Sequence, residues 1–111
     1  MKKIFISQPM RGKSEHQIKA ERALAVSEAA EFTQEEVEVI DSYFSEEYTR
    51  ALKLNESKNV PLKHLALSLS LLAEADLAVF AAGWNEARGC LIEHEAALAY
   101  GIKTLELDAH N

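Results

Sequence analysis

The sequence is poor in cysteine, with Cys90 as the single thiol in 111 residues, so no disulfide can form within the chain. Histidines are scattered, and no cysteine–histidine group has the spacing of a zinc site. We therefore expect neither a metal nor another cofactor. Such sparing use of cysteine is typical of a reducing compartment.

Long apolar runs are also missing. The most apolar stretch, residues 65–73, includes two serines, whereas a membrane span needs about 20 predominantly apolar residues. The apolar run near the N-terminus, residues 4–6, is too short for the core of a signal peptide. We expect a cytoplasmic protein without a membrane partner.

Basic residues are in the minority, with 12 Lys and Arg against 18 Asp and Glu and a net charge of −6. This balance argues against non-specific binding to DNA or RNA, which requires a basic surface. The charge is unevenly spread, however. Residues 1–22 contain six basic and two acidic side chains and carry +4, while the rest of the chain carries −10. Local positive charge of this kind suits a small anion better than a nucleic acid strand.

The chain does contain the alternation of strand and helix patterns that is typical of an α/β protein. A composition of 48% apolar and 27% charged residues fits one globular domain, residues 1–111. Apolar runs rich in β-branched residues predict four strands, at residues 3–7, 37–41, 76–82 and 103–108. The third is uncharged after its first residue, which favours a central position in the sheet.

Three helices are expected between these strands. A capping box from Ser14 to Gln17 predicts a helix that ends near Gln34. Residues 67–71 alternate like a strand, but length and Pro61 favour a helix over residues 61–74. A third helix is predicted over residues 90–100 and is closed by Gly101.

Residues 42–60 are the hardest to assign. One apolar helical face is offered by Tyr43, Phe44, Tyr48, Ala51 and Leu52, and residues 55–59 resemble a loop. The whole pattern predicts a small doubly wound, Rossmann- or flavodoxin-like α/β domain with about four parallel strands and flanking helices.

Polar and basic residues follow the first predicted strand, from Ser7 to Ser14. In open parallel sheets, ligands bind beyond the carboxyl ends of the strands. This loop offers hydroxyl, guanidinium and ammonium groups and a helix N-terminus, all of which favour an anion such as phosphate. It lacks the earlier glycine of a Walker A loop. The alternative is a solvated turn in which Arg11 and Lys13 bind nothing.

A second loop, Gly83 to Gly89, follows the third predicted strand. Its glycines permit close approach of a ligand to the backbone, and Trp84 offers a flat face to a ring. Glu93 lies one turn inside the next helix, where the helix dipole favours the ionised carboxylate that a nucleophile needs. Glu93, His94 and Glu95 cannot all face one site, because adjacent helix positions differ by about 100°. The alternative is that Trp84 packs in the core and the glutamates lie on the helix surface.

Cys90 is a rival nucleophile. It lies at the same helix N-terminus, where the pKa of a thiol falls, and His94 follows one turn later. A small cysteine that packs against the sheet is the more common situation.

Two segments resemble known proteins: KIFISQPMRGK at residues 3–13 and GWNEARGCLIEHEAALAYG at residues 83–101. They are similar to a small family found in bacteria and phages, which itself resembles the nucleoside 2-deoxyribosyltransferases and the 2′-deoxynucleoside 5′-phosphate N-hydrolases. The resemblance covers most of the chain and is weakest at residues 42–60. It implies a doubly wound α/β fold.

The resemblance also implies roles for individual residues. The related enzymes carry their nucleophilic glutamate eight residues before a glycine that precedes the last strand, and Glu93 and Gly101 have this spacing. The N-hydrolases hold a 5′-phosphate with a Gly-Ser-Ile-Arg-Gly-Gly-Arg loop, which residues 7–13 resemble through Arg11 and Gly12. The implied substrate-binding residues are Ser7, Gln8, Pro9, Met10, Arg11, Gly12, Trp84, Asn85 and Gly89.

The chain departs from those enzymes near the glutamate. Ala87 replaces an aspartate or serine, and Glu95 stands where a small residue is usual. The acid that assists departure of the base has no clear match among the polar residues before the third strand, Lys63, His64 and Ser68. We expect Glu86, Glu95 or water to take that part.

Together these features predict cleavage or transfer at the N-glycosidic bond of a (2′-deoxy)nucleoside or its 5′-monophosphate, with Glu93 as nucleophile. Two alternatives stay open: a nucleotide-binding module without turnover, and hydrolysis of the nicotinamide–ribose bond of NAD. The resemblance further implies a homo-oligomer, because the related enzymes complete their sites across subunits.

Overall fold

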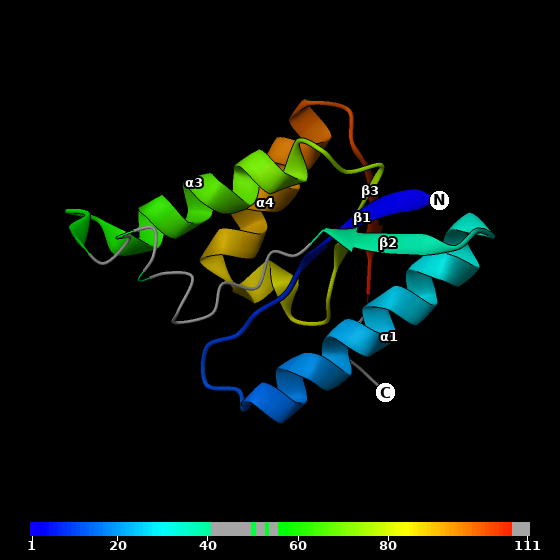
Figure 1. Cartoon of the computed structure of the whole chain (residues 1–111), viewed down its shortest axis with the longest axis horizontal. Helices are drawn as coiled ribbons and strands as arrows, with labels where there is room; N and C mark the ends of the chain where they lie inside the picture. The colour runs from blue at the N-terminus through cyan, green and yellow to red at the C-terminus, as the bar shows by residue number, and fades with distance from the viewer. Residues whose placement is uncertain (41–49, 51–52, 54–55, 108–111) are drawn as a thin grey trace.

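The computed structural model describes residues 1–40, 50, 53 and 56–107 (Figure 1). Along the chain the elements are β1 (Lys2–Ser7), α1 (Glu15–Thr33), β2 (Val37–Ile40), α3 (Val60–Leu72), β3 (Leu77–Phe80), the 3₁₀ helix η2 (Trp84–Glu86), α4 (Arg88–Ala99) and β4 (Lys103–Glu106). The apolar helical face predicted within residues 43–52 lies outside the described residues.

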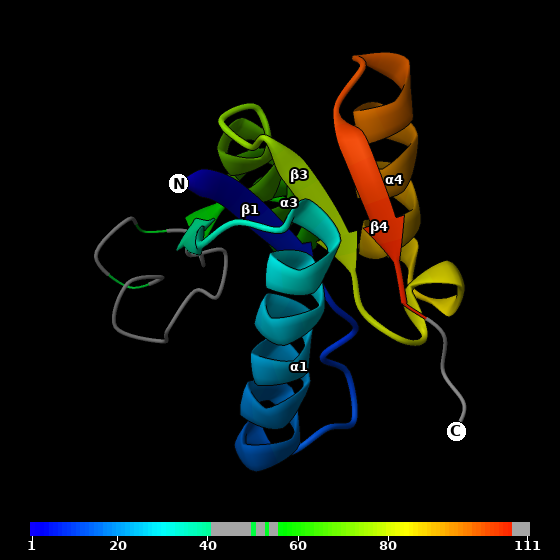
Figure 2. The same ribbon diagram turned by 90° about the vertical axis from the view of Figure 1, so that its right-hand side faces the viewer.

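The strands of the described chain form one parallel sheet in the order β2-β1-β3-β4. Helix α1 covers one face, and α3 and α4 cover the other (Figures 1 and 2). The predicted doubly wound α/β architecture is confirmed, and so is the central position of the third strand, which lies between β1 and β4.

Alternation along the two central strands builds the core on both faces. Ile4 and Ile6 of β1 pack toward α1, together with Leu77 and Val79 of β3, whereas Phe5 packs toward α3 and α4. Because successive side chains point to opposite faces, one buried strand serves two helical layers. Each fully buried aliphatic or aromatic side chain contributes about 1.5–3 kcal/mol of transfer free energy.

Local signals fix the helix ends. The Ser14 hydroxyl accepts a hydrogen bond from the Gln17 N–H, and the Gln17 side chain accepts one from the Ser14 N–H, so the predicted capping box is present. Asn59 caps α3 through the N–H of Leu62. At the end of α4, Gly101 has φ of +76°, and the Ile102 N–H donates to the Ala97 carbonyl in a Schellman arrangement.

Several predicted boundaries are wrong by one to three residues. Strand β3 ends at Phe80 rather than residue 82, because its partner β1 ends at Ser7, which pairs with Phe80. Helix α4 begins at Arg88 rather than residue 90, and the predicted loop before it contains η2. Helix α3 begins at Val60 and stops at Leu72, two residues before the predicted end.

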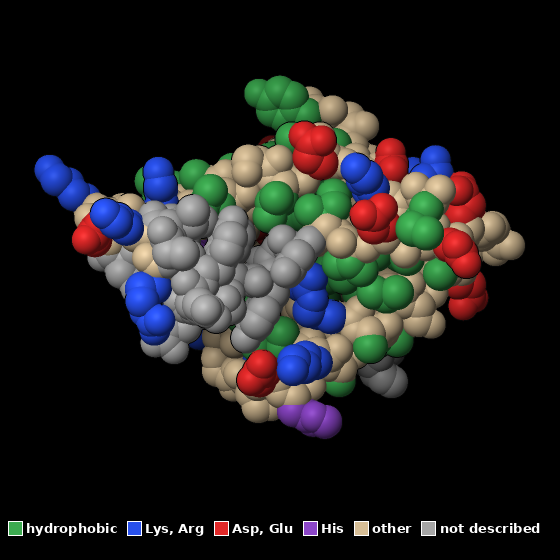
Figure 3. All heavy atoms as spheres, in the orientation of Figure 1, with side chains coloured by type: hydrophobic (Ala, Val, Ile, Leu, Met, Phe, Trp, Pro, Cys, Tyr) green, Lys and Arg blue, Asp and Glu red, His purple; other side chains and the backbone are tan. Residues whose placement is uncertain are grey.

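The charge is segregated on the surface as well. Acidic side chains gather at the right-hand edge of Figure 3, over the end of α1 and the start of β2, where the exposed residues include Glu31, Glu35, Glu36 and Glu38. This edge is opposite the carboxyl ends of the strands, toward which the β2 arrow points in Figure 1. None of the described helices has the length and apolarity to cross a membrane.

Candidate functional site

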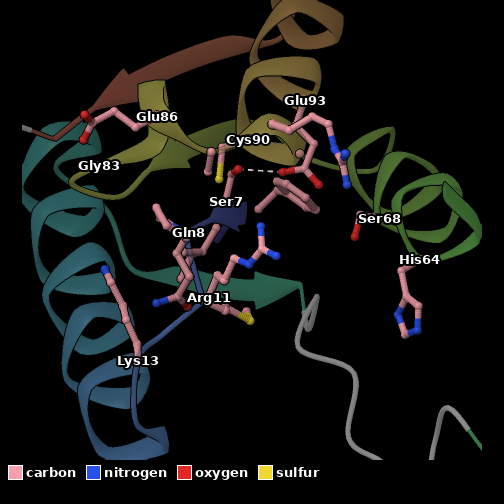
Figure 4. Close-up of a pocket in the computed structure, with 17 residues that line it drawn as sticks. Ser7, Gln8, Arg11, Lys13, His64, Ser68, Gly83, Glu86, Cys90 and Glu93 are labelled. Atoms are coloured by element: carbon pink, nitrogen blue, oxygen red, sulfur yellow. Dashed lines mark hydrogen bonds between the residues drawn. The ribbon is translucent and has the colours of Figure 1, made fainter. Parts of the chain in front are cut away.

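The order of the strands places a crevice at the ends of β1 and β3. The chain passes from β1 to β2 on one side and later to β3 on the other side of β1. Such a switch point between neighbouring parallel strands is where ligands bind in open α/β sheets. A cleft of about 780 Å³ lies there, within the range of small-molecule sites. Its walls include the ends of β1 and β3, the loops that follow them, and residues of α3 and α4 (Figure 4).

Glu93 and Ser7 meet in this cleft. The Ser7 hydroxyl donates a hydrogen bond of 2.5 Å to Oε1 of Glu93 (Figure 4). Glu93 is only 8% exposed and Ser7 only 2%. Burial raises the pKa of Glu93, and the hydrogen bond from Ser7 offsets this in part. The sequence-based expectation that the helix N-terminus favours the ionised form is therefore corrected, because loss of hydration is the larger effect.

Cys90 lies beside this pair but is not poised as a nucleophile. Burial raises the pKa of its thiol, and the nearby Glu93 charge raises it further. Cys90 is thus the buried cysteine that the sequence analysis gives as the more common situation, and its thiol is not activated by the helix N-terminus. His94, its proposed partner, instead bonds through Nε2 to Oε2 of Glu106 at 2.7 Å.

Cationic side chains surround the cleft: Arg11 and Lys13 from the first loop, and Arg88 from the start of α4. The Lys13 ammonium is paired with Glu21 of α1 at 2.8 Å. The Arg11 side chain points into the cleft (Figure 4), and no hydrogen bond or ion pair joins it to another described residue. Arg88 likewise has no hydrogen bond or ion pair to another described residue, so both guanidinium groups are available to meet an anion, and Arg11 is the one that Figure 4 shows entering the cleft.

The first loop is held by main-chain and side-chain bonds. The Lys13 N–H donates to the Met10 carbonyl at 3.2 Å, and Gly12, with φ of +77°, provides the left-handed position of this turn. Gln8 is buried and donates through Nε2 to the Ile18 carbonyl at 3.2 Å. Gln8 thus anchors the loop to α1 while it also lines the cleft.

The two loops lie close together at Gly83 and Pro9. A Cβ at Gly83 would lie 3.5 Å from Cγ of Pro9, and φ at Gly83 is +89°. Gly89 also lines the cleft, and a Cβ there would meet no atom within 4 Å. Both glycines line the cleft, and the space beside Gly83 faces Pro9 of the other loop.

Other predicted residues lie outside the cleft or at its edge. Trp84 stacks on His94 with ring centroids 4.2 Å apart and lies against Phe80 at 5.6 Å. Asn85 and Glu95 are exposed and are not among the residues that line the cleft. Glu86 lines it but is exposed, and Figure 4 shows it on the far side of Ser7 from Glu93.

Helix α3 supplies two cleft residues that the sequence did not identify as functional. His64 and Ser68 line the wall formed by α3 (Figure 4). Their i, i+4 spacing on a helix places them on one face, but a sequence pattern cannot show which face meets the cleft. Arg88 is a third such residue: it lines the cleft from the first turn of α4, whereas the sequence predicts a loop there.

No group of three or more histidine, cysteine, aspartate or glutamate side chains among the described residues is arranged to hold a metal ion. Comparison of the chain with models of protein families, with curated proteins and with solved structures finds no match. The function is therefore argued from the geometry of the cleft.

Proposed function

We propose that this protein cleaves or transfers the N-glycosidic bond of a (2′-deoxy)nucleoside 5′-monophosphate, with Glu93 as the nucleophile. The observation that carries the proposal is a buried carboxyl at the switch point of the sheet, held by Ser7 in a cleft that Arg11 also enters. A carboxyl of raised pKa in a cleft is a common mark of a reactive site. The resemblance of residues 3–13 and 83–101 to deoxyribosyltransferases and N-hydrolases supports the same chemistry.

The reaction follows the logic of retaining glycosidases. The ionised Glu93 attacks the anomeric carbon, the bond from that carbon to the base nitrogen breaks, and the base leaves with the electron pair. The base takes up a proton, and a glycosyl ester forms on Glu93. Water or a second base then attacks the same carbon and loses a proton to solvent, the ester bond to Glu93 breaks, and the carboxylate is restored.

The charges of the cleft favour a monophosphate over an uncharged nucleoside. Arg11 can form paired hydrogen bonds to phosphate oxygens, and Arg88 adds positive potential, while the Lys13 charge is paired with Glu21. The chain as a whole is acidic, with a net charge of −6. That net charge opposes the approach of a long polyanion, whereas one phosphate meets the local positive charge of the cleft.

A nucleotide-binding module without turnover is the second candidate. Departure of a base is aided by an acid, yet the wall formed by α3 offers His64 and Ser68 rather than a carboxyl. Glu86 is exposed at the rim, and Glu95 does not line the cleft. Weak assistance to the leaving base would give tight binding with slow or absent cleavage.

The decisive experiment incubates the protein with deoxynucleoside 5′-monophosphates, deoxynucleosides and NAD, and follows the free base or nicotinamide by chromatography. We expect base release from monophosphates in preference to nucleosides. Calorimetric binding of a monophosphate with no product by mass spectrometry would instead favour the binding module. Release of nicotinamide alone would redirect the proposal to NAD.

The phosphate contact is tested by Arg11→Met, which keeps an unbranched, flexible stem and removes the guanidinium with its charge. We expect KM for a monophosphate to rise about 10- to 100-fold, since a hydrogen bond to a charged group contributes about 1.5–3 kcal/mol, while KM for a nucleoside stays unchanged. Lys19→Met is the matched control, because Lys19 is exposed on α1 and does not line the cleft.

We also propose that the protein is a homo-oligomer, as the resemblance implies. Leu91, Leu98 and Tyr100 expose apolar surface on α4 and just after it, and such surface is commonly covered by association. Light scattering that gives the mass of one chain over the working concentration range would contradict this.

A further inference from the structure

We propose that Ser7 is a positioning residue for the reaction: it holds Oε1 of Glu93 so that Oε2 faces the substrate. This inference rests on the proposed function, and it gives Ser7 a different task from the phosphate contact that the sequence predicts.

The main chain fixes Ser7 firmly. It is the last residue of β1, it pairs with Phe80 of β3, and its carbonyl accepts a hydrogen bond from the Ala81 N–H at 2.9 Å. The side chain therefore projects from the rigid centre of the sheet rather than from the following loop. A donor placed in this way can hold a carboxylate to a small range of orientations.

The hydroxyl of Ser7 carries one proton, and Oε1 of Glu93 receives it. The same proton cannot be donated to a phosphate oxygen at the same time. The anion is left to groups without such a commitment, such as Arg11, whose guanidinium has no hydrogen bond or ion pair to another described residue.

The second oxygen of Glu93, Oε2, is available for chemistry. Among the described residues Glu93 has one hydrogen bond, through Oε1. Every fully buried side-chain oxygen of the described chain has a hydrogen-bond partner. Since Oε2 has none, it must be at least partly exposed. Since Glu93 lines the cleft, that surface opens on the space where a substrate would lie. One oxygen is thus held and the other is presented.

The same hydrogen bond controls how readily Glu93 ionises. Burial raises the pKa of Glu93, and the hydrogen bond from Ser7 is what lowers it. Without that bond the carboxyl would hold its proton to higher pH, and the fraction of enzyme with an ionised nucleophile would fall. Position and protonation state therefore depend on a single hydroxyl.

The test compares Ser7→Ala, which removes the donor, with Ser7→Cys, which keeps a weak donor of similar size. For cleavage of a deoxynucleoside monophosphate we expect kcat to fall about 10- to 100-fold in Ser7→Ala, with KM changed less than about 3-fold. The acid limb of the kcat profile should move to higher pH, and Ser7→Cys should recover part of both effects. Ser70→Ala is the matched control, because Ser70 is exposed on α3 and donates to the Leu67 carbonyl outside the cleft.

A second measurement does not depend on activity. The carboxyl carbon of Glu93 is titrated by ¹³C NMR in the wild-type chain, in Ser7→Ala and in Ser7→Cys, and circular dichroism verifies that each variant is folded. We expect the titration midpoint to rise in Ser7→Ala and to rise less in Ser7→Cys. If Ser7→Ala does not fold, the Ser7→Cys titration and rates decide.

The outcomes separate this inference from the proposed function. A rise in KM at constant kcat and constant pH profile would overturn positioning and restore the phosphate contact. An unchanged titration midpoint would overturn it regardless of activity. Absence of base release in the wild-type chain, together with a raised midpoint in Ser7→Ala, would contradict the proposed reaction while the effect of Ser7 on Glu93 stands.

Discussion

Glu93 of α4 and Glu106 of β4 are two carboxyl groups whose burial and hydrogen-bond partners differ. Glu93 is buried in the cleft with one neutral donor, Ser7, and burial raises its pKa. Glu106 of β4 accepts hydrogen bonds of 2.7 Å from Thr104 and, through Nε2, from His94. Partial burial raises the pKa of Glu106, but these bonds outweigh it and the net shift is downward.

The contrast shows what distinguishes a site from a structural pair. Glu93 and His94 are consecutive in α4, yet one enters the cleft and the other packs between Trp84, Phe80 and Glu106. At β4, the Glu106 carboxylate has two hydrogen-bond donors, Thr104 and His94. On the cleft side a carboxyl is buried with fewer donors than it can use, and such an arrangement is retained where reactivity needs it.

The largest expected effect concerns activity. Glu93→Gln should reduce kcat/KM for a deoxynucleoside monophosphate by on the order of 10³-fold or more, because the amide is a far weaker nucleophile. Glu106→Gln should leave it within about 2-fold. Free base is measured by chromatography for both variants. Equal losses would erase the contrast between the two carboxyls, and full activity in Glu93→Gln would remove Glu93 from the reaction.

Much of the fold follows from local patterns in the sequence. The buried run of β1, the capping box at Ser14 and the left-handed Gly101 each depend on near neighbours in the chain, and the structure has all three. The length of β3, in contrast, cannot be predicted from local sequence. Apolar residues continue to residue 82, but the ladder stops where its partner β1 stops, and a partner's end cannot be seen from β3 itself.

Part of the candidate site can likewise be predicted from the sequence, and part depends on tertiary structure. Glu93 and Arg11 were expected in one place because both follow the carboxyl end of a strand, and parallel strands bring these ends together. His64 and Ser68 enter the cleft only because α3 crosses over that edge, which is a tertiary feature. Trp84 was expected at the ligand, but η2 turns it toward His94, a contact that no spacing rule predicts.

A smaller effect is expected on stability. The pKa of Glu93 is higher in the folded chain than in the unfolded chain. The folded chain is therefore more stable while Glu93 is protonated, and this stabilisation is lost as pH rises from the ordinary glutamate pKa through the raised one. Glu93→Gln avoids that loss. Its Tm at pH 7 should exceed that of the wild-type chain by a few degrees, since about 1 kcal/mol shifts Tm by about 4–8 °C in a small domain. The difference should narrow toward pH 4.

Thermal unfolding followed by circular dichroism between pH 4 and 8 measures this. Glu95→Gln is the matched control on the exposed surface of α4, and a change within about 0.5 kcal/mol is expected for it. A lower Tm for Glu93→Gln at pH 7 would mean that the hydrogen bond from Ser7 more than offsets the burial of the charge.

The smallest effect, of opposite sign, is expected at Glu106. Its pKa is lowered on folding, so its contribution to stability is present above the ordinary glutamate pKa and is lost as pH falls through the lowered value. The Glu106 side chain is 37% exposed, so Glu106→Gln should cost only about 0.2–1 kcal/mol at pH 7 and less at pH 4. Urea unfolding, followed by the fluorescence of Trp84, measures this because the single tryptophan stacks on His94. Glu106→Gln and Glu93→Gln could instead change stability with the same sign at pH 7. In that case hydrogen bonding and burial would not distinguish the two carboxyl groups. Only the position of Glu93 in the cleft would then support it as the reactive group.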